Sequence, residues 1–465
     1  MVRNDDFHST CGRCGAGRAY LEMGMTRLSL FVAGTAAVAL ATTAAAKTPP
    51  AKPAHERPAA AAPDTAPAAP DGRATEPLLT VQQAVALASS DQPSVAAYES
   101  EAIAAEQAAA AARTLPDPVV SAGIQNYPVT GRNAPSPTRD EMTMYTIGVM
   151  GEQVRRSQRE AEAARLRSEA AVSRFQGSAR QRTIQRDVMK AWIAAVEARA
   201  KQGLLIRVIG DLRTGQKIME AGVPTGASTP ALALEAQAEV SLAESELADA
   251  KGAEERARGM LRRWIAAAAD RPLPDYIPRI DLPHGVAPDF NAHPEVLVAN
   301  AEEAAALGQA EVARTQRRPN VSWSATVGFR PAYGEMASLQ VSIPLQLNRR
   351  NLQDRRIAEA QARANAALLR AEDTKRDLGG QYSQALADYR SADARVQEIG
   401  GHAIPSLEAS FKAAEARYSG GQGTLELPLN IVRRYVETNI QLVVQQAAKA
   451  RAAADLIYLT GEPGR

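Results

Sequence analysis

Strict two-residue alternation marks two segments in the second half of the chain, at about 320–330 and 337–347. Apolar residues alternate there with small or polar ones, which predicts β-strands with one apolar and one polar face. A segment at about 142–150 has a similar apolar face, and a weaker alternation runs over 118–127. The apolar positions are Tyr145, Ile147 and Val149, then Val321, Trp323, Val327 and Phe329, then Leu339, Val341 and Ile343.

Helical patterns fill most of the remaining chain. A proline-free run predicts one helix from about Glu152 to Glu220, roughly 100 Å long at about 1.5 Å per residue. A second helix is predicted from Asn351 to Tyr418, with a local kink at Pro405. Shorter helices are predicted over 230–266 and 429–459. Helices of this length exceed the diameter of a globular domain, so they predict a rod or a tube.

The order of these elements occurs twice. Landmarks near the start of the pattern recur 201 residues later: Pro93, Arg113 and Pro118 return as Pro294, Arg314 and Pro319. Each half is expected to run helix, strand, strand, very long helix, tip and helix. The first repeat is placed at 78–266 and the second at 292–461, joined by a linker at 267–291. The predicted fold is mainly α with a β contribution from the two strand pairs.

The N-terminal region predicts an exported protein. Met25 and Arg27 precede an apolar run over 28–40, and a small-residue cleavage site ends before Lys47. Residues 1–46 are therefore interpreted as an over-extended start plus a signal peptide, with an uncleaved membrane anchor as the alternative. Residues 47–77 are rich in proline and alanine and predict an extended linker.

Composition and charge exclude several functions. Lys and Arg number 54 against 52 Asp and Glu, and such a balance argues against a nucleic-acid binder. No arrangement of residues indicates an enzyme, a metal site or a cofactor site. The histidines are scattered, the two cysteines have the spacing of only half a zinc site, and no phosphate-binding glycine loop is present. The candidate ligands are Cys11, Cys14, His55, His284, His293 and His402.

The strand pairs allow two interpretations. Each strand has about nine residues, enough for a tilted strand to cross a bilayer, but a soluble hairpin packed on a helix would alternate in the same way. Four strands cannot close a barrel, and an open sheet edge is not tolerated in lipid. If the hairpins span a membrane, the chain must associate: two copies give eight strands and three give twelve. The larger barrel leaves room for a water-filled lumen.

Several local motifs add a family resemblance. The segments 115–118, 142–144, 417–421 and 454–461, together with the duplication, resemble the TolC-type outer-membrane efflux family, most closely its heavy-metal-efflux branch. The resemblance implies a homotrimer in which a twelve-strand β-barrel continues into a twelve-helix α-barrel. Its barrel would lie in outer-membrane lipid and its helices in the periplasm.

The function implied by the resemblance is that of a passive exit duct. Substrate, expected to be metal cations, would arrive from a periplasmic adaptor and an inner-membrane pump of the RND type. A duct for drugs or other small molecules is one alternative. A periplasmic adaptor or a structural coiled-coil protein of the envelope is another.

The helix tips are the other candidate sites implied by the resemblance. Adaptor contact is expected at Gly222, Val223, Thr225 and Gly226 in the first tip, and at Tyr418, Gly420 and Gly421 in the second. The candidate gate residues are Glu426, Leu427 and Asn430. Glu426 lies one position away from where the family usually has an acidic residue, and Asn430 stands where a carboxylate is common. The periplasmic opening therefore departs from the family pattern.

Overall fold

The computed structural model describes residues 77–226, 228–280, 288–331, 333–420 and 426–461, with the backbone alone at 418 and 426–429. The predicted signal peptide and nearly all of the Pro/Ala-rich linker lie outside these residues, and so does Gly421. The first half contains α1 (Val81–Ser89), α2 (Pro93–Ala111), β1 (Val119–Gln125), β2 (Met144–Gln153), α3 (Arg156–Gly222) and α4 (Pro230–Ile265). A 3-10 turn over Ala266–Asp270 follows α4.

The second half repeats this order. After a 3-10 turn at Phe290–Ala292, it contains α5 (Pro294–Thr315), β3 (Val321–Phe329), β4 (Met336–Ser342), α6 (Gln353–Glu398), a π-turn (Ile399–Ala403), α7 (Ile404–Ser419) and α8 (Glu426–Thr460). Pro93 and Pro294, which recur in the sequence, both occupy the first turn of their helices. Proline suits this position because its missing N–H would have no intrahelical partner. The predicted duplication is confirmed.

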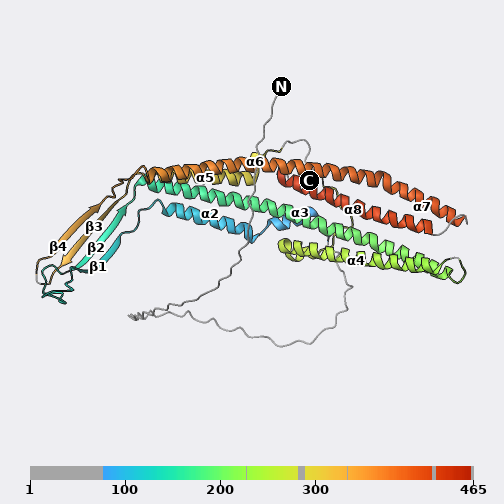
Figure 1. Cartoon of the computed structure of the whole chain (residues 1–465), viewed down its shortest axis with the longest axis horizontal. Coiled ribbons are helices and arrows are strands. Elements are labelled where there is room, and N and C mark those ends of the chain that lie inside the picture. Colours follow the sequence, from blue (N-terminus) through green and yellow to red (C-terminus); the bar gives the residue numbers. More distant parts are fainter. Residues whose placement is uncertain (1–76, 227, 281–287, 332, 421–425, 462–465) are drawn as a thin grey trace, which may run out of the picture. The chain divides into compact units, whose positions relative to one another are not determined.

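The helices pack in pairs that match the two repeats. In the first half α3 lies against α2 and α4, and in the second half α6 and α7 lie against α5 and α8 (Figure 1). The halves meet where α3 contacts α5 and α8. The strands form one antiparallel sheet in the order β1-β2-β3-β4, beyond the ends of α2, α3, α5 and α6 (Figure 1).

Two element boundaries differ most from the sequence-based expectation. The first long helix starts at Arg156 and not at Glu152, because β2 continues to pair with β3 as far as Gln153. The fourth strand ends at Ser342 and not near residue 347. Pro344 has no N–H to donate to a sheet ladder, which explains the early end of the strand. Ile343, expected on the apolar face of that strand, therefore lies just beyond it.

The second long helix is interrupted next to Pro405. The π-turn at Ile399–Ala403 separates α6 from α7 immediately before this proline. A proline inside a helix clashes with the carbonyl four residues earlier, here that of Gly401, and a π-turn is one way to relieve that clash. The predicted disturbance at Pro405 is thus realised as a change of helix type.

The main core lies where the halves meet. Buried side chains of α1, α3, α4 and α8 form one cluster around Trp192 and Leu261. A smaller cluster joins α5, α6 and the end of α8 around Leu378 and Leu456. Many other buried positions are alanines, which let neighbouring helices approach closely.

Candidate functional site

The pairing register gathers the predicted apolar residues on one face of the sheet. Residues directly opposite each other in antiparallel strands point to the same side. Of the ten predicted apolar positions, only Ile343 falls outside the strands. The face extends to β1 through Val120, Ala122 and Ile124. Its opposed pairs are Val120–Val149, Ala122–Ile147, Ile124–Tyr145, Tyr145–Phe329, Ile147–Val327, Gln153–Val321, Trp323–Val341 and Ala325–Leu339.

Both faces of the sheet are open to solvent in the single chain. On the apolar face Leu339 is 78% exposed and Val120 is 68% exposed. The opposite face carries mostly small or polar side chains, including Ser121, Thr146, Ser322, Ser324, Thr326, Ser338 and Gln340. A contiguous exposed apolar face on an ordered sheet marks an interaction surface, because leaving it in water is costly.

The sheet also has two free edges. Among the described residues β1 pairs only with β2, and β4 pairs only with β3. Their outer N–H and C=O groups therefore lack ladder partners within the chain, which is a template for pairing with another strand. Because the four strands alternate in direction, β1 and β4 run antiparallel to each other, so the edge of β4 matches the edge of β1 from a second copy.

The first helix tip is a compact turn held by backbone hydrogen bonds. The Ser228 N–H donates to the carbonyl of Gly222 at 3.2 Å, and the Thr225 hydroxyl donates to the same carbonyl at 3.0 Å. Gly226 has a φ of 75°, a left-handed conformation that glycine adopts without strain. The Thr229 hydroxyl accepts from the Leu232 N–H at 3.3 Å and caps the start of α4. Val223 and Thr225 lie on this turn.

The second tip is described only in part. Helix α7 ends at Ser419, and the Gly420 N–H donates to the carbonyl of Ala416 at 3.0 Å. Gly421 lies outside the described residues, as do the side chains of Tyr418, Glu426 and Leu427. The predicted contact and gate residues of this tip are therefore located by backbone position, with Glu426 and Leu427 in the first turn of α8.

Asn430 lies where α8 meets the hairpin of α3 and α4. It lines a cavity of about 60 Å³ together with Met219, Leu232 and Arg433. The Arg433 guanidinium forms an ion pair with Glu239 of α4 at 3.1 Å. This link between α8 and α4 near the tips is missed by sequence reasoning, because the two residues lie 194 positions apart.

Ion pairs also hold the C-terminal half of α8 against α3. Lys190 of α3 pairs with Asp455 at 2.6 Å, and Arg451 pairs with Glu197 of α3. Nearer the tips, a cavity of about 460 Å³ separates α8 from α3 and α7. It is lined by Leu204, Val208, Phe411, Val432, Tyr435 and others. Beside this cavity the Tyr435 hydroxyl of α8 donates to Glu408 of α7 at 3.0 Å.

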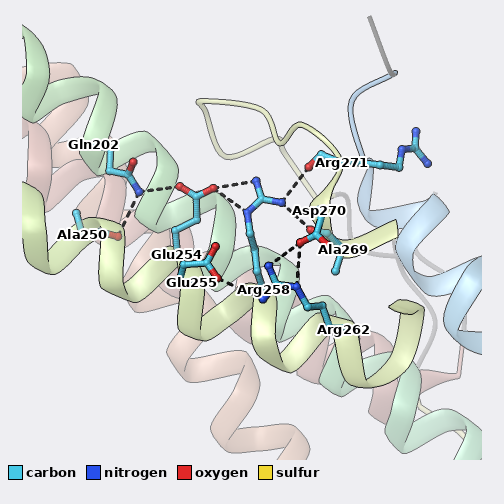
Figure 2. A network of polar contacts seen from close by, with 9 residues as sticks. All are labelled: Gln202, Ala250, Glu254, Glu255, Arg258, Arg262, Ala269, Asp270 and Arg271. Atoms are coloured by element: carbon cyan, nitrogen blue, oxygen red, sulfur yellow. Dashed lines mark hydrogen bonds and ion pairs between the residues drawn. The ribbon is translucent and has the colours of Figure 1, made fainter. Parts of the chain in front are cut away.

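A buried polar network fixes the α3–α4 hairpin at mid-length (Figure 2). Gln202 of α3 donates to Glu254 of α4 at 2.7 Å, and both side chains are buried. Glu254 also pairs with Arg258 at 2.8 Å. Arg258 in turn donates to the carbonyls of Ala269 and Arg271, which fixes the 3-10 turn after α4. The spacing of Glu254 and Arg258 is visible in the sequence, but their burial is not.

His293 has a structural role at the start of α5. It is 2% exposed and caps α5, with its Nδ1 accepting from the Glu295 N–H at 3.3 Å. Burial and the nearby Arg182 lower the pKa of His293. Its Nε2 lies 3.3 Å from the carbonyl of Tyr458, so the neutral ring carries its proton there. Burial, together with a hydrogen bond to Glu295, raises the pKa of Tyr458.

Two searches of the described residues bear on the chemistry. In that part of the chain, no group of three or more His, Cys, Asp and Glu side chains could hold a metal ion. None of the described helices combines the length and the apolar character that crossing a membrane requires.

The comparisons with known proteins identify the fold. Scans against models of known protein families and against curated proteins find no match. Solved structures do match. The outer-membrane channel OprN has a TM-score of 0.70 at 18% identity, covering 82% of this chain and 90% of that one. The Campylobacter jejuni CmeC outer membrane channel has a TM-score of 0.69 at 15% identity, covering 87% and 94%. CusC, described in terms of transmembrane channel formation, has a TM-score of 0.69 at 15% identity, covering 82% and 92%. This protein has the mainly α fold with a strand contribution that these channels share.

Proposed function

We propose that this protein is the outer-membrane exit duct of a tripartite efflux system, with its helices in the periplasm. The observation that carries the proposal is the continuous apolar face across four strands whose two edges are free. A sheet with these properties suits lipid on one side, provided that its edges are closed. The rival functions, a periplasmic adaptor or a structural coiled coil, leave the apolar face without a partner.

Closure of the edges calls for copies of the same chain. The β4 edge of one copy can pair with the β1 edge of the next, which is a head-to-tail contact that generates a ring. Three copies give twelve strands with the small, polar face lining the lumen. The described wall of that lumen would be mainly serine, threonine and glycine, together with Met144, Met150 and Met336. The protein would thus act as a conduit and not as an enzyme.

The partners follow from the ends of the duct. The turn at Gly222–Gly226 and the end of α7 at Ser419 mark the helix tips that would receive a periplasmic adaptor and, through it, an inner-membrane pump of the RND type. Metal cations are the proposed substrate class, supported by the resemblance of segments 115–118 and 142–144 to the heavy-metal branch. Drugs or other small molecules are the second candidate.

The gate is proposed at the tip end of α7 and α8. This is where a cavity of about 460 Å³ lies between α3, α7 and α8 and where Arg433 pairs with Glu239. Opening would move α7 and α8 outward while the buried network keeps α3 and α4 together. A bulky change such as Leu427→Trp should alter single-channel conductance, and an unchanged conductance would argue against a gate at that residue.

The test of the duct itself is fractionation followed by reconstitution. The mature protein should sediment with outer membranes, remain a trimer in detergent and conduct ions in planar bilayers. A monomer that stays soluble without detergent would refute the proposal. A trimer that inserts but does not conduct would leave the membrane location standing and refute the duct.

A further inference from the structure

The two ends of the sheet differ sharply in charge. At the end that joins the helices, the flanking segments 113–118, 152–160, 314–320 and 343–356 contain 11 arginines against 4 acidic residues. At the far end, the connecting segments 126–143 and 330–335 contain 3 arginines and 3 acidic residues. We call the first set the arginine belt. A net positive charge confined to one end of an apolar sheet points to a partner of negative charge at that end.

Part of the arginine belt has a structural task. Arg155 donates to the carbonyls of Thr315 and Arg318, so it ties α3 to the end of α5. Arg317 pairs with Asp354 at 3.2 Å. Arg349 and Arg350 are different. Both are exposed, and neither side chain forms a hydrogen bond or ion pair with any other described residue.

The segment between β4 and these arginines is amphipathic and exposed. Leu345 is 80% exposed and Leu347 is 91% exposed, among the highest values for large apolar side chains in the described chain. The Gln346 side chain donates to the carbonyl of Gln316 at 3.2 Å, which holds the segment in place. The apolar and polar alternation of the β4 sequence thus continues past the end of the strand, and its two leucines are open to solvent.

We infer that segment 343–350 and the arginine belt bind the anionic phospholipid headgroups of the membrane leaflet on the periplasmic side. Leu345 and Leu347 would enter the acyl-chain boundary, and Arg349 and Arg350 would meet the phosphates just outside it. Arginine binds phosphate oxygens through several N–H groups, and basic residues next to a spanning segment favour anionic leaflets. Trp323 sits at the same end of the apolar face, where an amphipathic ring suits the membrane interface.

This inference rests on the proposed membrane duct and adds the class of lipid that sets the depth of the duct in the membrane. It is tested by titrating the detergent-solubilised mature protein with phosphatidylglycerol or phosphatidylcholine and following the midpoint of thermal unfolding. Phosphatidylglycerol should raise the midpoint and phosphatidylcholine should not. The double variant Arg349→Gln/Arg350→Gln should need about twenty-five-fold more phosphatidylglycerol for the same shift, at about five-fold per arginine.

The matched control removes the same charge from the other end. The control variant is Arg132→Gln/Arg139→Gln, whose two arginines are exposed in the charge-balanced segment 126–143. Phosphatidylglycerol should raise its unfolding midpoint as much as that of the unchanged protein. Equal responses of all three proteins, or an equal effect of phosphatidylcholine, would overturn the inference. Conductance in neutral bilayers separates the two proposals. Channels that form there without any phosphatidylglycerol preference refute only the lipid site, whereas failure to insert in any bilayer refutes the duct and the lipid site with it.

Discussion

The indole N–H of Trp192 donates a hydrogen bond of 2.9 Å to the carbonyl of Leu79, and both side chains are buried in the main core. The Leu79 N–H in turn donates to the carbonyl of Pro272 at 2.8 Å. One indole thereby joins the start of the described chain, the middle of α3 and the segment after α4. These three parts are distant in sequence, so the bond is a marker of correct packing between them.

Replacing this indole should destabilise the protein measurably. In Trp192→Phe the Leu79 carbonyl loses its partner in a dry environment, which costs about 1–3 kcal/mol in the free energy of unfolding. The matched control is Trp264→Phe, since the half-buried indole of Trp264 donates no hydrogen bond within the described residues. Chemical unfolding of both variants should show the larger loss for Trp192→Phe, and equal losses would contradict the assignment.

The buried network in Figure 2 makes a second prediction. Glu254→Gln removes the negative charge that faces Arg258, and the side chains of this pair are only 12% and 11% exposed. Leaving a buried charge unpaired costs about 3 kcal/mol. Asp270→Asn is the control, because it breaks the exposed pair with Arg262 next to the same network. Thermal unfolding should show a large shift for Glu254→Gln and a much smaller one for Asp270→Asn; similar shifts would show that burial of the pair is not what matters.

How far the sequence predicts this structure depends on the strength of each local pattern. The strict alternation at 321–329 was enough to predict both the strand and its apolar face. In β1 the pattern is weak, and the assignment of Val120 and Ile124 to the apolar face comes only from their pairing with Val149 and Tyr145. Alternation defines two faces within a strand, whereas register decides which faces combine.

Burial of polar groups was beyond prediction for a different reason. Glu and Arg four residues apart are common on exposed helix surfaces, so Glu254 and Arg258 carry no sign of being buried. Pairs between distant helices, such as Arg433 with Glu239, leave no local pattern at all. Proline is the more informative signal: Pro405 predicts the disturbance of the second long helix, and Pro344 marks the end of β4.

The buried His293 makes the stability of the protein depend on pH. Its pKa is lowered in the folded state, mainly by burial and also by Arg182, whereas an unfolded histidine titrates near 6.5. Below about pH 6.5 the unfolded chain takes up a proton that the folded chain refuses, so stability should fall there by up to about 1.4 kcal/mol per pH unit. Above that pH the contribution of His293 should be complete and constant.

Two variants isolate this histidine. His293→Asn keeps a side-chain acceptor at the start of α5. It should flatten the pH dependence of the free energy of unfolding below about pH 6.5. His402→Asn, in the exposed π-turn, is the matched control for the loss of a histidine. The free energy of unfolding, measured across this range, decides the matter. A slope that survives in His293→Asn would assign the acid sensitivity to another group.

The two faces of β3 offer the sharpest test of the membrane assignment, because neighbouring residues point to opposite sides. Val327 lies on the apolar face opposite Ile147, and Thr326 lies on the polar face opposite Gly148. An arginine on a lipid-facing strand costs about 2–4 kcal/mol at the middle of the bilayer, and one facing a water-filled lumen costs far less. Val327→Arg should therefore reduce insertion into lipid vesicles, while Thr326→Arg should insert normally and change conductance. If Thr326→Arg blocked insertion and Val327→Arg did not, the two faces would be assigned the wrong way round. If both variants inserted equally well, neither face would meet lipid.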